Sequence, residues 1–255
     1  MNKIHKVLSL GVKNETIEIV PFGDIHYGSK CCRIDKFKRL VDWVKSKPNT
    51  YMIGMGDLID CIIPKDKRFD IDSGDEYNMI DDLVEDMEMM LAPIKSRIIC
   101  MLMGNHEYHM FKDGYGDPIK KICKNLCIPY GGFSSFIKLS ITPRTHCKSL
   151  VIWAHHGWFA GRKRGGKVNN LEDNMANYDA DIYLAGHSHD LWATRKSRVY
   201  WSGSRDVIFG NTGSFLETAS KGTISYAERA NYPPQKLGVL KIKWLPRQEK
   251  IYASE

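Results

Sequence analysis

The sequence predicts an α/β fold, and two features of the chain lead to this assignment. Short apolar runs alternate with segments whose apolar residues recur every three or four positions, which is the order of strands and helices around a parallel sheet. Five of the apolar runs end in polar side chains that bind ligands, as strands of such sheets do at their carboxyl ends. With 255 residues, 43% of them apolar, the chain is expected to form a single domain over residues 1–255.

The first half of the chain has the pattern of strand, helix and strand. Residues 16–22 and 51–55 predict strands, and residues 33–46 between them carry apolar side chains at helical spacing. A second amphipathic helix is expected over residues 76–94, with its acidic face in solvent, and residues 97–103 predict the third strand. This order is typical of βαβ units in a parallel sheet.

The second half is richer in strands. A short helix is expected over residues 117–127, followed by strands at 136–141, 150–154 and 182–185. The apolar runs then become short and are separated by Gly, Ser and Pro, at residues 198–201, 206–209, 222–226 and 237–244. Such a tail predicts antiparallel strands that form a second sheet packed on the first.

The polar residues at the strand ends form five blocks. In chain order these are Gly23-Asp24-Ile25-His26, Gly56-Asp57, Gly104-Asn105-His106-Glu107, His155-His156-Gly157 and Gly186-His187-Ser188-His189. A polar turn explains any one block about as well as a ligand site does. Five strand ends that carry His, Asp or Asn predict one shared site.

The ordered blocks DIH, GD, GNHE, HHG and GHSH resemble the signature of the calcineurin-like metallophosphoesterases, which is DxH, GD, GNH[DE], H and GHxH. The resemblance spans residues 24–189. It implies a four-layer α/β/β/α sandwich, in which helices flank two mixed β-sheets. It also implies a hydrolase, namely a phosphoesterase with a dinuclear metal centre. Residues 211–215 are similar to the turn that follows GHxH in this family.

The resemblance also assigns roles to individual side chains. One ion would be held by Asp24, His26 and His189. The other would be held by Asn105, His155 and His187. Asp57 would bridge the two ions, and a water between them would become the hydroxide that attacks phosphorus. His106 would stabilise the transition state or protonate the leaving oxygen. Oxygen and nitrogen ligands favour Mn²⁺, with Fe, Zn or Ni as alternatives.

Alternatives remain at three positions. His155 is preferred to His156 as the ligand because it is the first residue after the predicted strand, but family members show both contexts. Asp60 is predicted to orient the ring of His106, and a solvated turn residue is the alternative. Glu107 is expected either to hydrogen bond to the metal ligands or to act as a charge at a helix N-terminus.

The charge of the chain bears on the substrate. A net charge of +7 favours an anionic substrate. In the Gly-rich segment AGRKRGGK, Arg162, Lys163 and Arg164 are predicted to bind substrate phosphates, and a solvated basic turn is the alternative. Protein phosphatases of this family carry Arg directly after the second Asp of GDxxD, where this chain has Cys61. A missing Arg disfavours a protein phosphatase.

The predicted activity is therefore that of a phosphodiesterase or nuclease acting on a nucleotide or nucleic acid. The alternatives are a phosphomonoesterase, such as a protein or nucleotide phosphatase, and a non-catalytic metal-binding interaction module on the same fold. Seven cysteines without a CxxC pair favour a reducing compartment. Because neither a signal peptide nor about 18 consecutive apolar residues is present, we expect a cytoplasmic protein without a membrane partner. The oligomeric state is left open.

Overall fold

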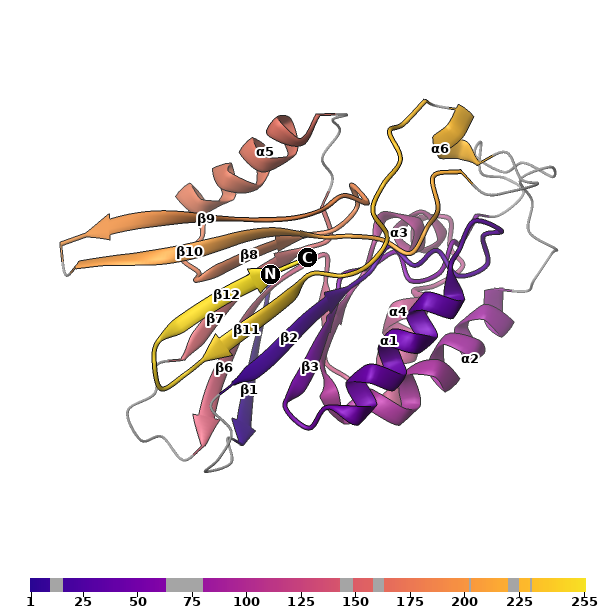
Figure 1. The fold of residues 1–255 in the computed structure, drawn as a ribbon. Coiled ribbons are helices and arrows are strands. Elements are labelled where there is room, and N and C mark those ends of the chain that lie inside the picture. Colours follow the sequence, from indigo (N-terminus) through magenta and orange to yellow (C-terminus); the bar gives the residue numbers. More distant parts are fainter. Residues whose placement is uncertain are drawn as a thin grey trace.

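Two β-sheets lie face to face at the centre of the computed structural model, and helices cover both outer sides (Figure 1). The structure describes residues 1–9, 16–62, 80–142, 149–157, 163–201, 203–219, 225–229 and 231–255. Both sheets mix parallel and antiparallel neighbours, so the predicted α/β sandwich of two mixed sheets flanked by helices is confirmed.

Sheet I has six strands. In spatial order they are β12 (Lys250–Ser254), β11 (Lys241–Leu245), β2 (Ile17–Phe22), β3 (Thr50–Gly54), β4 (Ile98–Leu102) and β5 (Tyr130–Gly132). Strands β2 to β5 are parallel, whereas β11 is antiparallel to β2 and to β12. The carboxyl ends of β2, β3 and β4 therefore point the same way.

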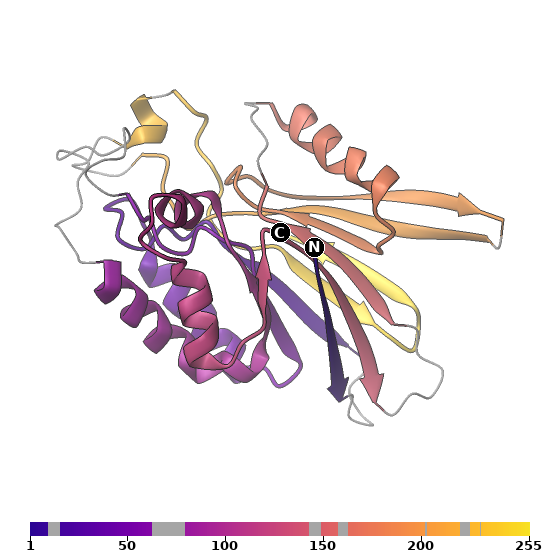
Figure 2. The ribbon, with the colours of Figure 1, turned by 180° about the vertical axis from the view of Figure 1, so that it is seen from behind.

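Sheet II also has six strands. Their order is β1 (Asn2–Ser9), β6 (Ser134–Thr142), β7 (Leu150–His155), β8 (Ile182–Ala185), β10 (Gly203–Thr212) and β9 (Leu191–Tyr200). Strands β7, β8 and β10 are parallel, and β9 and β10 form an antiparallel hairpin. Seen from behind, this hairpin extends beyond the rest of the sheet (Figure 2).

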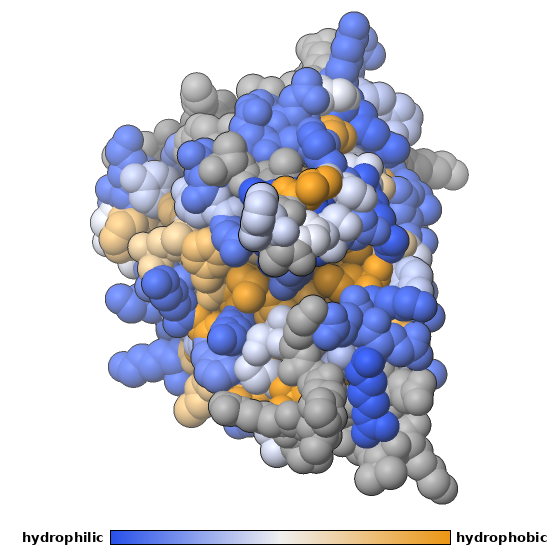
Figure 3. Space-filling model, turned by 90° about the vertical axis from the view of Figure 1, so that its left-hand side faces the viewer, coloured by the Kyte–Doolittle hydropathy of each residue, from blue (hydrophilic) through white to orange (hydrophobic). Residues whose placement is uncertain are grey.

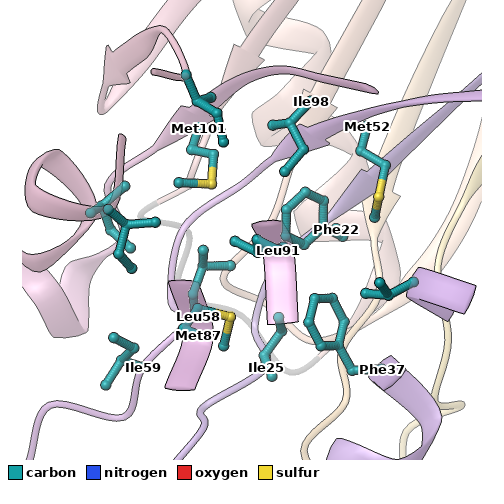
Figure 4. Packing of buried hydrophobic residues seen from close by; sticks show 14 of the residues in the cluster. Phe22, Ile25, Phe37, Met52, Leu58, Ile59, Met87, Leu91, Ile98 and Met101 are labelled. Carbon is teal, nitrogen blue, oxygen red and sulfur yellow. The ribbon is translucent and has the colours of Figure 1, made fainter. Parts of the chain in front are cut away.

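Apolar packing holds the layers together. Helices α1 (Ile34–Ser46), α2 (Ile80–Leu91) and α4 (Pro118–Leu126) cover sheet I. Beneath them the rings of Phe22 and Phe37 are fully buried and stack at 5.7 Å (Figure 4). Burial of such a side chain contributes about 1.5–3 kcal/mol. A second cluster fills the space between the sheets, where Ile53 and Ile152 are fully buried. Helix α5 (Arg164–Asn177) covers the outer face of sheet II.

The C-terminal strands depart from the prediction. The expected antiparallel pairing is present in β9–β10 and in β11–β12, but the four strands do not form one sheet, because β9 and β10 extend sheet II while β11 and β12 extend sheet I. The runs expected at 198–201 and 206–209 belong to the two ten-residue strands of one hairpin. Strand β1 was not predicted, since it lies at a sheet edge, is largely exposed and lacks an apolar run.

Other elements begin or end differently from the prediction. The block GNHE opens a helix, since Asn105 is the first residue of α3 (Asn105–Lys112), which is the helix that one alternative for Glu107 required. The second helix is α2 followed by a 3₁₀ helix (Ala92–Arg97), and residues 76–79 lie outside the described part. Residues 220–224 lie outside it too, and a short helix α6 (Tyr226–Arg229) follows them. For the polar stretch from Asp60 to residue 75 the sequence predicts a loop beside the site, and this stretch is described only to residue 62.

The surface is mainly hydrophilic on the side toward which the β9–β10 hairpin extends, with a recessed band of hydrophobic residues between its hydrophilic flanks (Figure 3). Within the described residues, no helix has both the length and the apolar character needed to cross a bilayer.

Candidate metal centre

Loops at the carboxyl ends of strands from both sheets meet at one place. The loop after β2 is joined to the loop after β3 by a hydrogen bond from the Asp24 amide to the Gly56 carbonyl, 3.0 Å. Across the sandwich, the amide of His187 donates to the Asp24 carboxylate at 2.9 Å. The predicted convergence of distant strand ends is therefore present in the fold.

A first group of possible metal ligands consists of Asp24, His26 and His189, each offering one atom, with all three atoms within 4.8 Å of one another. The Nε2 atoms of the two histidines are 3.1 Å apart, and the His26 Nδ1–H donates to Asp60 at 3.0 Å. That bond leaves the Nε2 lone pair of His26 free to face the group. A cation between the two rings would satisfy both nitrogens.

A second group consists of Asp57, His156 and His187. The amide oxygen of Asn105 lies beside it, 2.9 Å from His156 Nε2 and 2.6 Å from His187 Nδ1. His156 Nδ1–H donates to the carbonyl of Met55 at 2.7 Å, so its Nε2 is the atom directed into the group. Carboxylate, amide oxygen and imidazole together suit Mn²⁺, Fe, Zn or Ni.

Asp57 belongs to the second group and also lies close to the first. Its Oδ2 atom is 3.8 Å from His26 Nε2 in one group and 3.4 Å from His156 Nε2 in the other. Its second oxygen, Oδ1, accepts a hydrogen bond from the His106 amide at 2.9 Å. A carboxylate held in this way is placed to contact ligands of both groups.

The placement of the histidine pair differs from the prediction. His155 was chosen as the ligand, but the structure directs His156 to Asn105 and Asp57. His155 is the last residue of β7, and its ring stacks on Trp153, two residues earlier, in the cluster beneath α5. Because successive side chains of a strand point to opposite faces, the next residue is the one directed inward. The choice of His155 is therefore corrected to His156.

His106 and Asp60 lie at the edge of the first group. The His106 ring contacts His26 edge to face, with ring centroids 4.5 Å apart. Its Nδ1–H donates to the Asp60 carbonyl at 2.5 Å and lies 3.3 Å from the Asp60 carboxylate. The same carboxylate binds His26, so Asp60 contacts both rings. The side chains of His106 and Asp60 are only 12% and 10% exposed, which disfavours the solvated-turn alternative for Asp60.

The two alternatives for Glu107 are both realised. It is the third residue of α3 and accepts a hydrogen bond from the Gly104 amide, which is a capping contact. Its carboxylate also accepts from the amides of Asp57 and Leu58 at 3.0 and 2.7 Å. Burial and the charge of Asp57 raise the pKa of Glu107 to about 7.

The electrostatics of the centre favour a cation. Burial alone would raise the pKa of Asp57, but the positive charges of His156 and His106 outweigh burial and hold it well below its usual range. For His156 burial lowers the pKa, whereas the Asp57 carboxylate outweighs burial and raises it to about 9. Burial lowers the pKa of His187 to about 4. The negative potential that holds a proton on His156 would equally attract a divalent cation.

The backbone of the centre is strained. Five candidate ligands have left-handed φ angles: Asp24 (48°), His26 (52°), Asp57 (50°), His187 (64°) and His189 (55°). Such a conformation costs about 1–3 kcal/mol for a residue other than glycine and recurs at functional sites. The left-handed backbone could not be predicted from the sequence, because none of these positions holds glycine, the residue that usually adopts it.

The basic segment is only partly described. Arg162 lies outside the described residues, and the exposed Lys163 precedes helix α5. Arg164 lies 3.3 Å from the carboxylate of Asp190, directly after the GHSH block. The buried Lys167 lies 3.7 Å from the same carboxylate and donates to the carbonyl of Ser188 at 3.3 Å. Substrate binding by this segment therefore stays a prediction.

Two contacts that support the centre were not predicted. The hydroxyl of Ser214 donates to the carbonyl of Asp24 at 2.8 Å, and the side-chain amide of Asn211 donates to the carbonyl of Gly186 at 3.2 Å. Both residues belong to the segment 211–215, whose similarity to a family turn was the available signal. They tie the end of β10 and the turn after it to two of the ligand loops.

Comparisons with protein families and with solved structures found similar proteins. A model of the calcineurin-like phosphoesterase family matches residues 17–191. A metallophosphoesterase from Sphaerobacter thermophilus has a TM-score of 0.43 and 11% identity, over 94% of this chain and 89% of that one. Zinc-complexed Vps29 from Entamoeba histolytica has a TM-score of 0.40 and 10% identity, over 93% and 97%. A predicted phosphoesterase from Streptococcus pneumoniae has a TM-score of 0.39 and 14% identity, over 94% and 96%. The curated proteins gave no match.

Proposed function

We infer the function from one premise: the chain belongs to the calcineurin-like phosphoesterase family. We propose that it hydrolyses a phosphodiester with the help of two divalent cations. The observation that carries the proposal is the meeting of two ligand groups around Asp57, contributed by loops from both sheets. The donor atoms are carboxylate, amide and imidazole throughout, which is the set expected for such cations.

Each ion would be held by side chains that the fold already brings together. One group comprises Asp24, His26 and His189. The other comprises Asn105, His156 and His187. Asp57 would contribute to both, and Mn²⁺ is the cation we expect. When bound, two such ions supply Lewis acidity and lower the pKa of water enough to make it a nucleophile near neutral pH.

His106 would serve the leaving group. Its Nδ1–H donates to the carbonyl of Asp60, so Nε2 is the ring atom that would donate to a substrate oxygen. The nearby Asp60 carboxylate stabilises the protonated ring, in which Nε2 carries the proton to be donated. Asp60 thus holds the ring in one orientation and favours its charged form.

The proposed preference for a diester depends on Cys61. A monoester dianion has one more charged oxygen than a diester and usually requires an additional cationic side chain. Where protein phosphatases of this family carry Arg after the second Asp, this chain has a thiol that is 3% exposed. The net charge of +7 also suits a nucleotide or nucleic acid substrate.

The test is hydrolysis of bis-(4-nitrophenyl) phosphate and 4-nitrophenyl phosphate with Mn²⁺, with Ni²⁺ and with EDTA. We expect metal-dependent turnover of the diester. Turnover of the monoester alone would indicate a phosphatase, and no turnover by metal-loaded protein would indicate a binding module. His106→Ala should lower kcat at least ~100-fold while two ions remain bound. An unchanged kcat would remove His106 from the mechanism.

Action on nucleic acid requires its own test. Single-stranded and duplex DNA and RNA are incubated with the Mn²⁺-loaded protein at several salt concentrations. Reversing the charges of Lys163 and Arg164 should weaken cleavage and reduce its salt dependence, because fewer phosphate contacts remain. Equal cleavage and equal salt dependence in wild type and variant would contradict substrate binding by these residues.

A further inference from the structure

We propose that Glu107 is a positioning residue, whose buried carboxylate ties the loop after β3 to the loop after β4 and thereby orients Asp57. The inference rests on the proposed function, since Asp57 is there the residue shared by both ions. Glu107 itself is placed to contact neither a metal nor a substrate, because its carboxylate is directed at backbone amides.

The contacts of Glu107 saturate its carboxylate. One oxygen, Oε2, accepts hydrogen bonds from the amide of Asp57 at 3.0 Å and from the amide of Gly104 at 2.9 Å. The other, Oε1, accepts from the amides of Leu58 at 2.7 Å and Ile59 at 3.3 Å. The side chain is fully buried. Three of these four donors belong to the loop that carries Asp57.

Helix capping alone does not account for this arrangement. A capping contact explains the bond from Gly104, three residues before Glu107. The other three donors lie 48 to 50 residues away in the sequence. A solvent-exposed Glu would cap the helix without the cost of burying a charge. The burial of this carboxyl group is therefore explained by the connection between the loops.

The consequence for Asp57 is a fixed orientation. Glu107 holds the backbone of Asp57, which has a φ of 50°, while the His106 amide binds the Oδ1 atom of Asp57. That leaves Oδ2 facing the two ligand groups. The loops are also in direct contact, because a Cβ on Gly104 would lie 2.1 Å from Asp57 Oδ1.

Glu107→Gln tests the inference. An amide nitrogen cannot accept a hydrogen bond, so two of the four backbone donors lose their partner whichever way the amide is turned. Glu172→Gln is the matched control, because Glu172 pairs with Lys196 at 2.8 Å on the surface. Amide hydrogen exchange is measured on all three proteins without metal, and Mn²⁺ affinity is measured by calorimetry.

We expect exchange in Glu107→Gln to rise at least ~10-fold at residues 57–59 and 104, with strands β3 and β4 unchanged. Mn²⁺ affinity should fall about 10–100-fold, the usual effect of removing a group that orients a metal ligand. Glu172→Gln should match the wild type in both. If Glu107→Gln does not fold, Glu107→Asp is measured in its place. It keeps the charge but has a shorter reach, and the same changes in amide exchange and Mn²⁺ affinity are expected.

Two results would overturn the inference. One is Mn²⁺ affinity within about twofold of the wild type. The other is exchange that is unchanged in the two loops or is raised evenly throughout the fold, since an even rise indicates only a general loss of stability. Should the wild type bind no Mn²⁺, the proposed function fails, whereas the exchange data still decide whether Glu107 connects the loops.

Discussion

Replacing each histidine of the His155-His156 pair by Ala separates the two possible ligands. His156 is fully buried, and its ring binds the carbonyl of Met55 and the side chain of Asn105. The Asn105 oxygen keeps His187 as a partner, whereas the Met55 carbonyl loses a donor at a cost of about 1–3 kcal/mol, and Asp57 loses the ring that lies 3.4 Å from its Oδ2 atom. With the cavity included, the metal-free His156→Ala variant should lose about 3–5 kcal/mol of its free energy of unfolding.

His155→Ala is the matched control. Its ring is half-buried and stacks on Trp153 with centroids 5.6 Å apart, a contact worth about 0.5–1.5 kcal/mol. Its Nδ1 atom also accepts a hydrogen bond from the Gly157 amide at 2.7 Å, and a hydrogen bond between neutral groups contributes a further ~1 kcal/mol. His155→Ala is therefore expected to lose about half as much free energy of unfolding as His156→Ala.

Metal content is the decisive assay. Each protein is equilibrated with Mn²⁺, dialysed and analysed by mass spectrometry of the metal, in parallel with urea unfolding without metal. Wild type and His155→Ala should retain two ions for each chain, and His156→Ala should retain one. Retention of two ions by His156→Ala together with loss of one by His155→Ala would refute the assignment made from the strand geometry.

Three further predictions concern the same centre. Mn²⁺ at about 100 times its Kd should stabilise the wild type by about 2.7 kcal/mol in urea unfolding, and EDTA should remove the effect. Gly104→Ala should cost about 1–3 kcal/mol and reduce the bound metal, because its Cβ would overlap Asp57, whereas Gly165→Ala, with open space around it, should not destabilise the fold. Asp190→Asn should weaken Mn²⁺ binding about tenfold in calorimetry, because Lys167 loses the carboxylate that holds it against the GHSH loop.

The convergence of the ligand loops could be predicted because each block follows a buried parallel strand. For sheet I the apolar runs and the helices between them are sufficient, and the predicted strands near 16–22, 51–55 and 97–103 are confirmed by β2, β3 and β4. Parallel neighbours then bring Asp24, Asp57 and Asn105 to one edge.

Other features depended on information that is not local. The strand before the histidine pair extends one residue further than predicted, and a shift of one residue exchanges the inward and outward side chains. Strands β1 and β12 lie at sheet edges, where exposed and half-buried residues alternate without an apolar run. The partners of Glu107 could not be inferred, because three of its four hydrogen bonds join positions about fifty residues apart.

The stability of the fold and the chemistry of the centre come from different parts of the chain. Apolar layers on both sides of sheet I and beneath α5 supply the favourable burial. The loops, in contrast, hold left-handed backbone at residues such as Asp24 and Asp57, with buried carboxylates beside imidazoles. Such an arrangement persists only where the surrounding structure determines it. A divalent cation would stabilise these charges directly, so the unfavourable features of the metal-free centre are the ones that give it affinity for metal.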